Sequence, residues 1–428
     1  MLGGVNIKTE VTVVGAGPCG SFSALAASKL GAQVIVYEEQ SDIGVPSHCA
    51  GHLSISSLKH FGLYPSPAGI VENKFNGAIV YAPSGNSFPV QFSSPVTCVV
   101  NRELFDKYLA KLAMKAGAEY HLESRVKSLV LERRFVRGIT VCHKGAKETV
   151  HSKIVIDAEG ISSTLLKIVG LQSLNRSMIV NGVQAEINGI EGVDKDVVEV
   201  YLGRKFAPGF FAWVIPKRDG SAKVGLATNR GNPQDYLQRF IHKHPVASKK
   251  LGKSKIVHLC FHPITLGGAI PKTYSNGLLV VGDAASQVKP TTGGGVTFGL
   301  VCSEIAGKVA YEAVKTNDFS EAFLSKYQHG WKKAIGFDMA VMHRIRKMVN
   351  RLPDSKIDRL VTLYKKLEVG EILQKVGDVD FQGKLLTQAA WHPKALALLL
   401  YFVFSSFVSP LTFKSVLRNA KTDSHVRI

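Results

Sequence analysis

Two glycine-rich turns near opposite ends of this 428-residue chain constrain its fold more than any other feature. One follows an apolar run within residues 11–20, and the other follows an apolar run within residues 278–285. In both, a strand-like stretch leads through glycines into a helix-like stretch, a pattern typical of dinucleotide-binding α/β domains. One such turn is a weak signal, but two indicate that distant parts of the chain hold one ligand.

The glycines of the first turn have separate steric roles. Gly15 permits a tight turn, Gly17 lets backbone N–H groups approach a pyrophosphate, and Gly20 lets the helix pack closely on the strand. Glu38 ends the next predicted strand and is spaced to bind ribose hydroxyls. A glycine turn that binds nothing is the alternative, and the order of strand, helix and acid disfavours it.

The second turn favours FAD over a nicotinamide cofactor. Asp283 directly follows an apolar run, where its carboxylate can accept hydrogen bonds from a ribityl chain. Gly295 closes a run of three glycines just before a predicted helix that begins at Val296. The N-terminus of that helix would stabilise negative charge on a reduced flavin. A nicotinamide enzyme needs no such second element, so we expect FAD.

Strand and helix patterns predict an α/β fold of the Rossmann type in three parts. Residues 1–162 and 272–318 are expected to form a discontinuous FAD-binding domain. Residues 163–271 contain short alternating strands, which predict an antiparallel-sheet substrate domain. Residues 319–428 are expected to form a helical C-terminal cap, for which docking on a membrane is one interpretation.

Charge and cysteine usage narrow the class of protein. A net charge of +20 favours an anionic partner, although a lineage with basic proteins would show the same balance. The chain has no zinc-ligand spacing, RNP-like aromatic motif or concentrated basic arm, so nucleic acid is not expected. Six scattered cysteines without a close pair argue against a metal site and fit a reducing cytosol. The first residues lack a secretory signal, and we expect a cytoplasmic location.

An uncharged segment at residues 395–413 suggests contact with lipid. Its length lies at the threshold for a membrane span, and its serines and Pro410 weaken that interpretation. The alternatives are an interfacial helix on the cytoplasmic face of an anionic membrane or a buried wall of a lipid cavity. Flanking basic residues, from Lys332 to Arg351 and then Lys414 and Arg418, favour docking on anionic lipid.

Several further motifs resemble the geranylgeranyl reductase family of FAD enzymes, within the fold group of para-hydroxybenzoate hydroxylase and glutathione reductase. The resemblance covers roughly residues 8–315 and includes the two glycine turns. The other matching motifs are Pro46-Ser-His-Cys49-Ala-Gly51, Asn101-Arg102-Glu-Leu-Phe105-Asp106, Asp157-Ala-Glu-Gly160 and Phe211-Ala-Trp213-Val-Ile-Pro216. Phe211 and Ile215 replace a family tyrosine and phenylalanine, so the substrate pocket loses a phenol donor.

This resemblance implies reduction of C=C bonds in geranylgeranyl chains, and the chain looks most like the archaeal digeranylgeranylglycerophospholipid reductases. The implied partners are a prenylated lipid and an electron donor, which is NADPH, ferredoxin or a deazaflavin. The FAD contacts that the resemblance implies are Cys19, Glu38, Cys49, Ala50, His52, Arg102, Val126, Asp283, Gly295 and Val296.

Cys49 is the candidate catalytic residue. Alkene reduction needs a proton, and an ordinary thiol is mostly protonated at neutral pH. The alternative is a small buried apolar residue. Its neighbour His48 either tunes the thiol or is a plain loop histidine.

Other candidates are less specific. Phe211 and Trp213 alternate along a predicted strand, so both should face the same side, either lining a prenyl pocket or packing in the core. Arg102 opens a predicted helix, where a cation is unfavourable, which hints at a ligand role. Asp106 is expected to be a solvated helix residue.

Two rival functions remain open. The segment from Phe211 to Pro216 also resembles a motif of flavin-dependent halogenases, so a monooxygenase or halogenase of the same fold group is one rival. The cysteine segment around Cys49 argues against it. The other rival is a non-catalytic, membrane-associated flavoprotein. Fold alone does not distinguish these three functions.

Overall fold

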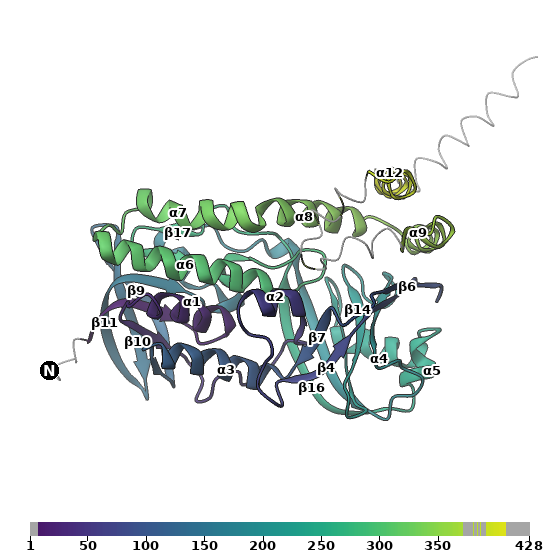
Figure 1. Cartoon of the computed structure of the whole chain (residues 1–428), viewed down its shortest axis with the longest axis horizontal. Coiled ribbons are helices and arrows are strands. Elements are labelled where there is room, and N and C mark those ends of the chain that lie inside the picture. The colour runs from purple at the N-terminus through teal and green to yellow at the C-terminus, as the bar shows by residue number, and fades with distance from the viewer. Residues whose placement is uncertain (1–6, 371–379, 381–382, 384–385, 387–390, 408–428) are drawn as a thin grey trace, which may run out of the picture.

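The first glycine turn follows a central strand of an eight-stranded sheet and leads into helix α1 (Pro18–Ser28), which is labelled in Figure 1. The computed structural model describes residues 7–370, 380, 383, 386 and 391–407. The main path of the sheet runs β17 (Tyr274–Ser275), β18 (Leu278–Val280), β11 (Ala146–Asp157), β1 (Ile7–Val14), β2 (Val34–Tyr37) and β8 (Glu119–His121). The strands from β18 to β8 are parallel, whereas β9 (Ser124–Glu132) and β10 (Phe135–His143) extend β11 as an antiparallel ribbon. Because β1 and β18 are parallel to β11 between them, both glycine turns leave the same edge of the sheet.

Three helices cover one region of this sheet and bury its apolar side chains. They are α1 (Pro18–Ser28), α3 (Arg102–Lys115) and α6 (Val296–Thr316), with α1 packed between the other two. Small residues allow the close approach of α1 and α6, since a Cβ added at Gly307 would lie 2.6 Å from Ala26 Cβ. This packing joins the chain after the first turn to the chain after the second.

A seven-stranded sheet forms the second part of the molecule. Its order is β16 (Lys255–Thr265), β12 (Ile179–Asn188), β15 (Ala222–Thr228), β14 (Phe211–Pro216), β13 (Val197–Leu202), β5 (Gly77–Tyr81) and β6 (Ser87–Gln91). All pairs are antiparallel except β13 with β5. Helices α4 (Pro233–Lys243) and α5 (Ala247–Leu251) pack on it. The expected fold class is therefore confirmed.

Two strands of this second sheet come from a part of the chain that the sequence grouped with the FAD-binding segment. β5 and β6 lie within residues 1–162, yet β5 pairs with β13. β5 and β6 form a local hairpin, but the strand next to this hairpin in the sheet, β13, lies more than a hundred residues further along the chain. The domain limits as a whole stay a prediction.

A three-stranded sheet connects the two larger ones. Its strand order is β3 (His52–Ser54), β7 (Thr97–Val100) and β4 (Val71–Phe75). In the chain, the short helix α2 (Ile55–His60) follows β3, and α3 follows β7. The loop that carries Cys49 enters this sheet directly at β3. The sheet therefore fixes the C-terminal end of the Cys49 loop relative to α3, because β3 pairs with β7 and α3 follows β7 in the chain.

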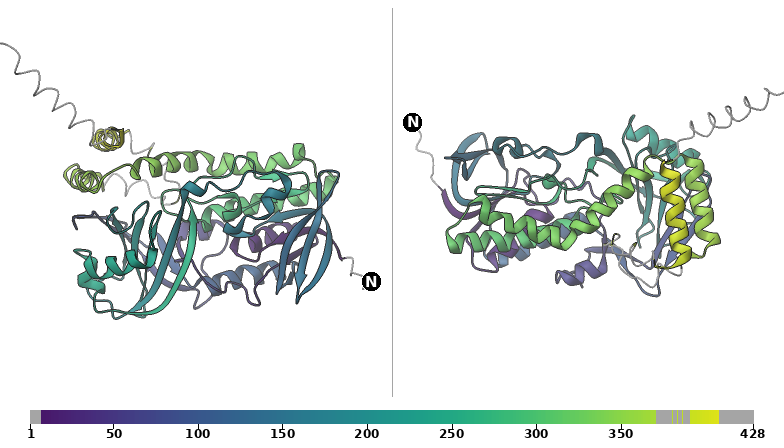
Figure 2. Two further views of the ribbon diagram at one scale, coloured as in Figure 1. Left: turned by 180° about the vertical axis from the view of Figure 1, so that it is seen from behind. Right: turned by 90° about the horizontal axis from the view of Figure 1, so that it is seen from above.

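Helices follow α6 to the end of the described chain (Figure 2). α7 (Glu321–Trp331) continues through a π-helical turn at Lys332–Gly336 into α8 (Phe337–Val349). α9 (Asp354–Lys366) and α12 (Pro393–Phe407) lie side by side near β6. Among the residues with a described structure, no helix is long and apolar enough to cross a membrane. The remainder of the predicted apolar segment, with Pro410, Lys414 and Arg418, lies outside the described residues.

Candidate functional site

A cavity of about 620 Å³ lies where the sheets and the N-termini of α1 and α6 meet. Its lining includes most of the residues that the sequence singled out, among them Gly17, Cys19, Glu38, Cys49, Ala50, His52, Arg102, Phe211, Trp213, Asp283, Gly295 and Val296. Gly15, Gly20 and Val126 are not among the lining residues. The two glycines shape the turn, and Val126, a residue of β9, packs against a core cluster.

The first turn has the geometry of a pyrophosphate cradle. A Cβ added at Gly15, whose φ is +95°, would lie 2.5 Å from the Ala158 carbonyl oxygen, and one added at Gly20 would lie 1.8 Å from the Gly15 oxygen. A Cβ at Gly17 would instead meet no protein atom within 4 Å, and Gly17 borders the cavity. Gly15 and Gly20 are thus required by the protein itself, whereas Gly17 leaves space for a ligand.

Backbone donors are open at this turn because α1 starts at Gly17 with no side-chain cap. The adjacent carboxylate of Glu38 is held in place, accepting hydrogen bonds from the Ala16 N–H at 2.7 Å and the Gln40 N–H at 3.0 Å. A helix N-terminus with free donors beside a fixed carboxylate suits a phosphate and a ribose, respectively.

The second turn touches the first through Cys19. Cβ atoms added at Gly282 and Gly299 would lie 2.7 Å and 2.3 Å from its sulfur, so the thiol fills a notch between β18 and α6. Burial raises the pKa of the Cys19 thiol to about 12, which keeps it neutral. Cys19 therefore packs the two turns together, whatever further contact it makes with a ligand.

Asp283 and α6 complete this end of the cavity. Burial raises the pKa of the Asp283 carboxyl, and the Arg102 guanidinium opposes part of that effect. A Cβ at Gly295 would lie 2.8 Å from Asp283 Oδ1, and α6 begins there without a side-chain cap. Backbone donors are open at the N-termini of α1 and α6, and the space at Gly17 exists only because that residue has no side chain. The residues therefore fit FAD.

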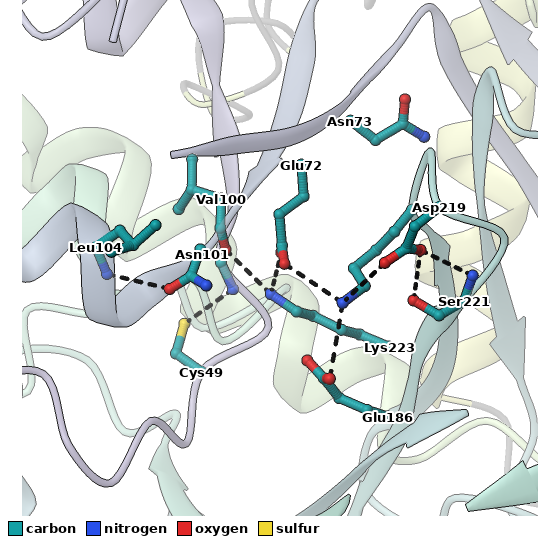
Figure 3. A network of polar contacts seen from close by, with 12 residues as sticks. Cys49, Glu72, Asn73, Val100, Asn101, Leu104, Glu186, Asp219, Ser221 and Lys223 are labelled. Carbon is teal, nitrogen blue, oxygen red and sulfur yellow. Dashed lines mark hydrogen bonds and ion pairs between the residues drawn. The ribbon is translucent and has the colours of Figure 1, made fainter. Parts of the chain in front are cut away.

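The Cys49 loop is supported from behind by a polar network (Figure 3). The Gly51 N–H donates to the Cys49 sulfur at 3.4 Å, and the Gly51 carbonyl accepts from Val100 at 2.9 Å. The buried ammonium of Lys223 donates to the Val100 carbonyl at 3.0 Å and to Glu72 at 2.7 Å. The loop is therefore tied through β7 to β15 of the substrate sheet.

Further charges hold Lys223 in place. Lys217 lies 3.4 Å from Glu72, 3.6 Å from Glu186 and 3.7 Å from Asp219 (Figure 3). The sequence analysis did not find this network, because its members come from four strands or loops that only the fold brings together.

The expectation that Asp106 is solvated is wrong. Its carboxylate is buried and accepts two hydrogen bonds from Arg102, at 3.1 Å and 2.9 Å. Burial lowers the pKa of the Arg102 guanidinium, but the nearby Asp106 carboxylate raises it, and the net effect is a raised pKa. Arg102 lines the cavity with its charge balanced one helical turn away. The helical spacing was visible in the sequence, but the burial of both residues under the Cys49 loop was not.

Phe211 and Trp213 both line the cavity, and both also pack against buried apolar residues beside it. Trp213 Nε1–H donates to Gln184 Oε1 at 3.3 Å, and the Phe211 ring stacks on Phe210 with centroids 4.2 Å apart. Across the strands, Gln184 pairs with Cys260 on β16. One face of the seven-stranded sheet therefore presents an aromatic and amide wall to the cavity.

His48 belongs to a cluster that the sequence analysis did not find. Its ring stacks on His262 with centroids 5.2 Å apart, and both residues line the cavity beside Cys49 and Cys260. Burial lowers the pKa of both imidazoles, which favours their neutral form. The alternation of His258, Cys260 and His262 on one strand was a signal that could have been recognised.

His52 and Lys289 also line the cavity. His52 Nε2 hydrogen-bonds Thr97 Oγ1 at 2.8 Å, and burial lowers the pKa of its imidazole to about 4. Lys289 forms a buried ion pair with Asp380, which also accepts a hydrogen bond from Ser57. Residues from the C-terminal region therefore reach the cavity, a contact that no local pattern indicates.

Comparison with known proteins identifies the family. Residues 8–301 match a family model described as an FAD binding domain. The chain is 34% identical to digeranylgeranylglycerophospholipid reductase of Methanocaldococcus jannaschii over 402 residues, which cover 93% of this chain and 98% of that protein. The chain belongs to the geranylgeranyl reductase family. A second relative, reductase 2 of Methanopyrus kandleri, is 33% identical over 86% of this chain and 96% of that protein.

Solved structures agree with this membership. A geranylgeranyl bacteriochlorophyll reductase-like protein from Thermoplasma acidophilum superposes with a TM-score of 0.84 at 30% identity, covering 93% of this chain and all of that one. A p-nitrophenol 4-monooxygenase from Pseudomonas putida, with a TM-score of 0.67 at 16% identity over 91% of this chain and 98% of that one, shares the fold alone. The family resemblance and the FAD cofactor expected from the sequence are confirmed, and the chain is an FAD enzyme of the geranylgeranyl reductase family.

Proposed function

We propose that this enzyme saturates C=C bonds in geranylgeranyl chains of archaeal-type ether lipids. The observation that carries the proposal is the close approach of the aromatic wall, at Phe210, to the flavin loop, which is the glycine-rich loop of residues 290–295 before α6. A Cβ added at Gly293 would lie 3.1 Å from Phe210 Cζ and 3.0 Å from Ile264 Cγ2. An apolar chain lying on Phe210 and Phe211 would therefore run beside the loop that opens α6.

The relatives support the substrate class, since two of them are digeranylgeranylglycerophospholipid reductases. When bound and reduced, FAD supplies hydride chemistry. The chain's residues would do the rest: Phe211 and Trp213 hold the prenyl chain by apolar contact, and their wall excludes water. Cys49 would donate its S–H proton to the alkene carbon that does not receive the hydride. The resulting thiolate would be reprotonated from solvent, because Cys49 is exposed at the mouth of the cavity.

Lipid mass spectrometry tests the reaction. The gene is co-expressed with a pathway that makes unsaturated archaeal ether lipids, and the expected result is a series of products heavier by two hydrogens per reduced bond. A flavin-free variant serves as the matched control. Unchanged lipids from an FAD-loaded enzyme supplied in turn with NADPH, reduced ferredoxin and reduced deazaflavin would overturn the proposal. Oxygenated or halogenated products would favour the monooxygenase or halogenase rival.

We further propose that α12 docks on the cytoplasmic face of an anionic membrane. Leu396, Leu400 and Phe404 repeat every four residues and are 41%, 59% and 69% exposed, so they form one apolar stripe. Exposed basic residues on α8, α9 and the loop between them supply charge complementary to acidic lipid, namely Arg344, Lys347, Arg351, Arg359, Lys365 and Lys366. Such docking would bring the enzyme to its lipid substrate.

Replacing Leu400 with glutamate is expected to weaken binding to acidic-lipid vesicles about tenfold, since an apolar contact of roughly 1.5 kcal/mol is lost. Vesicle sedimentation measures the change. Leu131→Glu is the matched control, because Leu131 is 45% exposed on β9, at the other end of the molecule. Equal binding by all three proteins would contradict docking through α12.

A further inference from the structure

Arg346 on α8 reaches from the C-terminal helices to the loop that opens α6. Its side chain donates to the Pro290 carbonyl at 2.9 Å and to the Thr291 carbonyl, and a third donor lies 3.5 Å from the Gly209 carbonyl. The guanidinium also lies over the Phe210 ring, 4.8 Å from its centroid. Arg346 is only 4% exposed. One side chain thus contacts both the cofactor loop and the residues that begin the aromatic wall.

Among the described residues, no carboxylate balances the charge of Arg346 or forms an ion pair with it. Burial lowers the pKa of its guanidinium to about 10, so it still carries a full positive charge at neutral pH. Backbone carbonyl dipoles are its partners, and a buried cation held this way is costly to keep. Other buried cations of the site differ, since Arg102, Lys223 and Lys289 each have a carboxylate partner.

The loop before α6 and the Phe210 segment, both held by Arg346, lie against each other beside the cavity. Residues 292–296 and Lys289 line the cavity, and the Lys289 carbonyl accepts from the Gly293 N–H at 2.8 Å, which closes the loop on itself. Phe210 stacks on Phe211, and Gly293 has room for no side chain against Phe210. A shift of the loop relative to Phe210 would therefore disturb both the cofactor end and the substrate end of the cavity.

We propose that Arg346 is a positioning residue that locks the glycine loop to the aromatic wall and provides a fixed positive charge behind that loop for the reduced form of FAD. Reduction by two electrons and one proton would leave the isoalloxazine ring of bound FAD with one negative charge at neutral pH. A nearby cation in a site of low dielectric favours that form. The predicted effect of Arg346 on the reduction of FAD requires only that FAD is bound. Its predicted effect on lipid binding rests also on the proposed function.

Two substitutions separate geometry from charge. Arg346→Lys keeps the charge but loses the planar fork that reaches three carbonyls, whereas Arg346→Met loses both. Arg239→Met is the matched control, because Arg239 is an exposed helical arginine on α4 that lines neither the cavity nor the proposed docking surface. FAD affinity, the FAD reduction potential against a reference dye, and KM and kcat for the prenyl lipid are measured for each, together with thermal melting.

Arg346→Met is expected to disfavour reduction of bound FAD about tenfold, which for two electrons is a potential lower by ~30 mV. Arg346→Lys should keep most of the potential but raise KM for the lipid several-fold, because the wall is no longer held to the loop. Arg239→Met should match the wild type. If Arg346→Met does not fold, the lysine variant still tests the link between loop and wall through its KM.

A lower melting temperature with an unchanged potential and KM in the FAD-loaded variants would overturn the proposal, because Arg346 would then be structural only. The potential is measured without lipid. A wild-type enzyme that reduces no prenyl lipid, with a lowered potential in Arg346→Met, would therefore refute the proposed function but not the role of Arg346 toward FAD.

Discussion

Replacing Gly17 with valine is expected to abolish FAD binding while leaving the protein folded. Gly17 has a φ of −63°, which any residue adopts, and a Cβ there meets no protein atom within 4 Å. The added side chain would enter the place at the N-terminus of α1 where a pyrophosphate approaches the backbone. We expect FAD affinity to fall by about a hundredfold or more, equivalent to ~2.7 kcal/mol. The absorbance of bound flavin after gel filtration and a titration of the apoprotein measure the loss.

Gly20→Ala is the contrasting variant. Its Cβ would lie 1.8 Å from the Gly15 carbonyl oxygen, so this smaller change should destabilise the protein even without FAD. The apoprotein melting temperature should therefore fall for Gly20→Ala and remain near the wild-type value for Gly17→Val. A yellow Gly17→Val protein with normal FAD affinity would show that the pyrophosphate does not lie at this turn.

Replacing Cys49 with alanine is expected to lower turnover by about a hundredfold or more, which is the usual contribution of a positioned general acid. FAD should stay bound, because Cys49 is exposed at the cavity mouth and the glycine turns do not depend on it. The measurement is the rate at which prenyl lipid reoxidises reduced enzyme in a single turnover without oxygen. This readout excludes effects on the electron donor.

The matched control is Cys260→Ala. Cys260 lines the same cavity from β16, so its loss changes volume and polarity to a similar extent without removing the proposed acid. Full activity in the Cys260 variant and strong loss in the Cys49 variant would assign the proton to Cys49. Equal rates for Cys49→Ala and the wild type would remove Cys49 from the mechanism.

The dinucleotide elements could be predicted because they are local. A strand, Gly15 to Gly20, and a helix are contiguous in the chain, and the acid Glu38 follows at a set distance. The steric needs of a tight turn and of a backbone that approaches phosphate act within a few residues, so the residue pattern carries them directly. The alternation of Phe211 and Trp213 placed both on one side of a strand for the same reason, but it did not say which side faced the cavity.

The features that were missed or misjudged depend on contacts between distant segments. Asp106 has the spacing of a surface helix residue, and only the covering Cys49 loop makes its ion pair with Arg102 a buried one. The stacked pair of His48 and His262 and the clamp from Arg346 to the carbonyls of Pro290 and Gly209 join parts of the chain more than fifty residues apart.

The sequence by itself determined the cofactor, the strand-turn-helix units that hold it and the family to which the chain belongs, because these follow from backbone conformations that few residues permit. Only the tertiary structure decided which side chains face the cavity, which charges are buried and paired, and how the C-terminal helices reach the flavin loop. Burial and ion pairing depend on what packs over a residue, and that is set by the whole fold rather than by the neighbours in the chain.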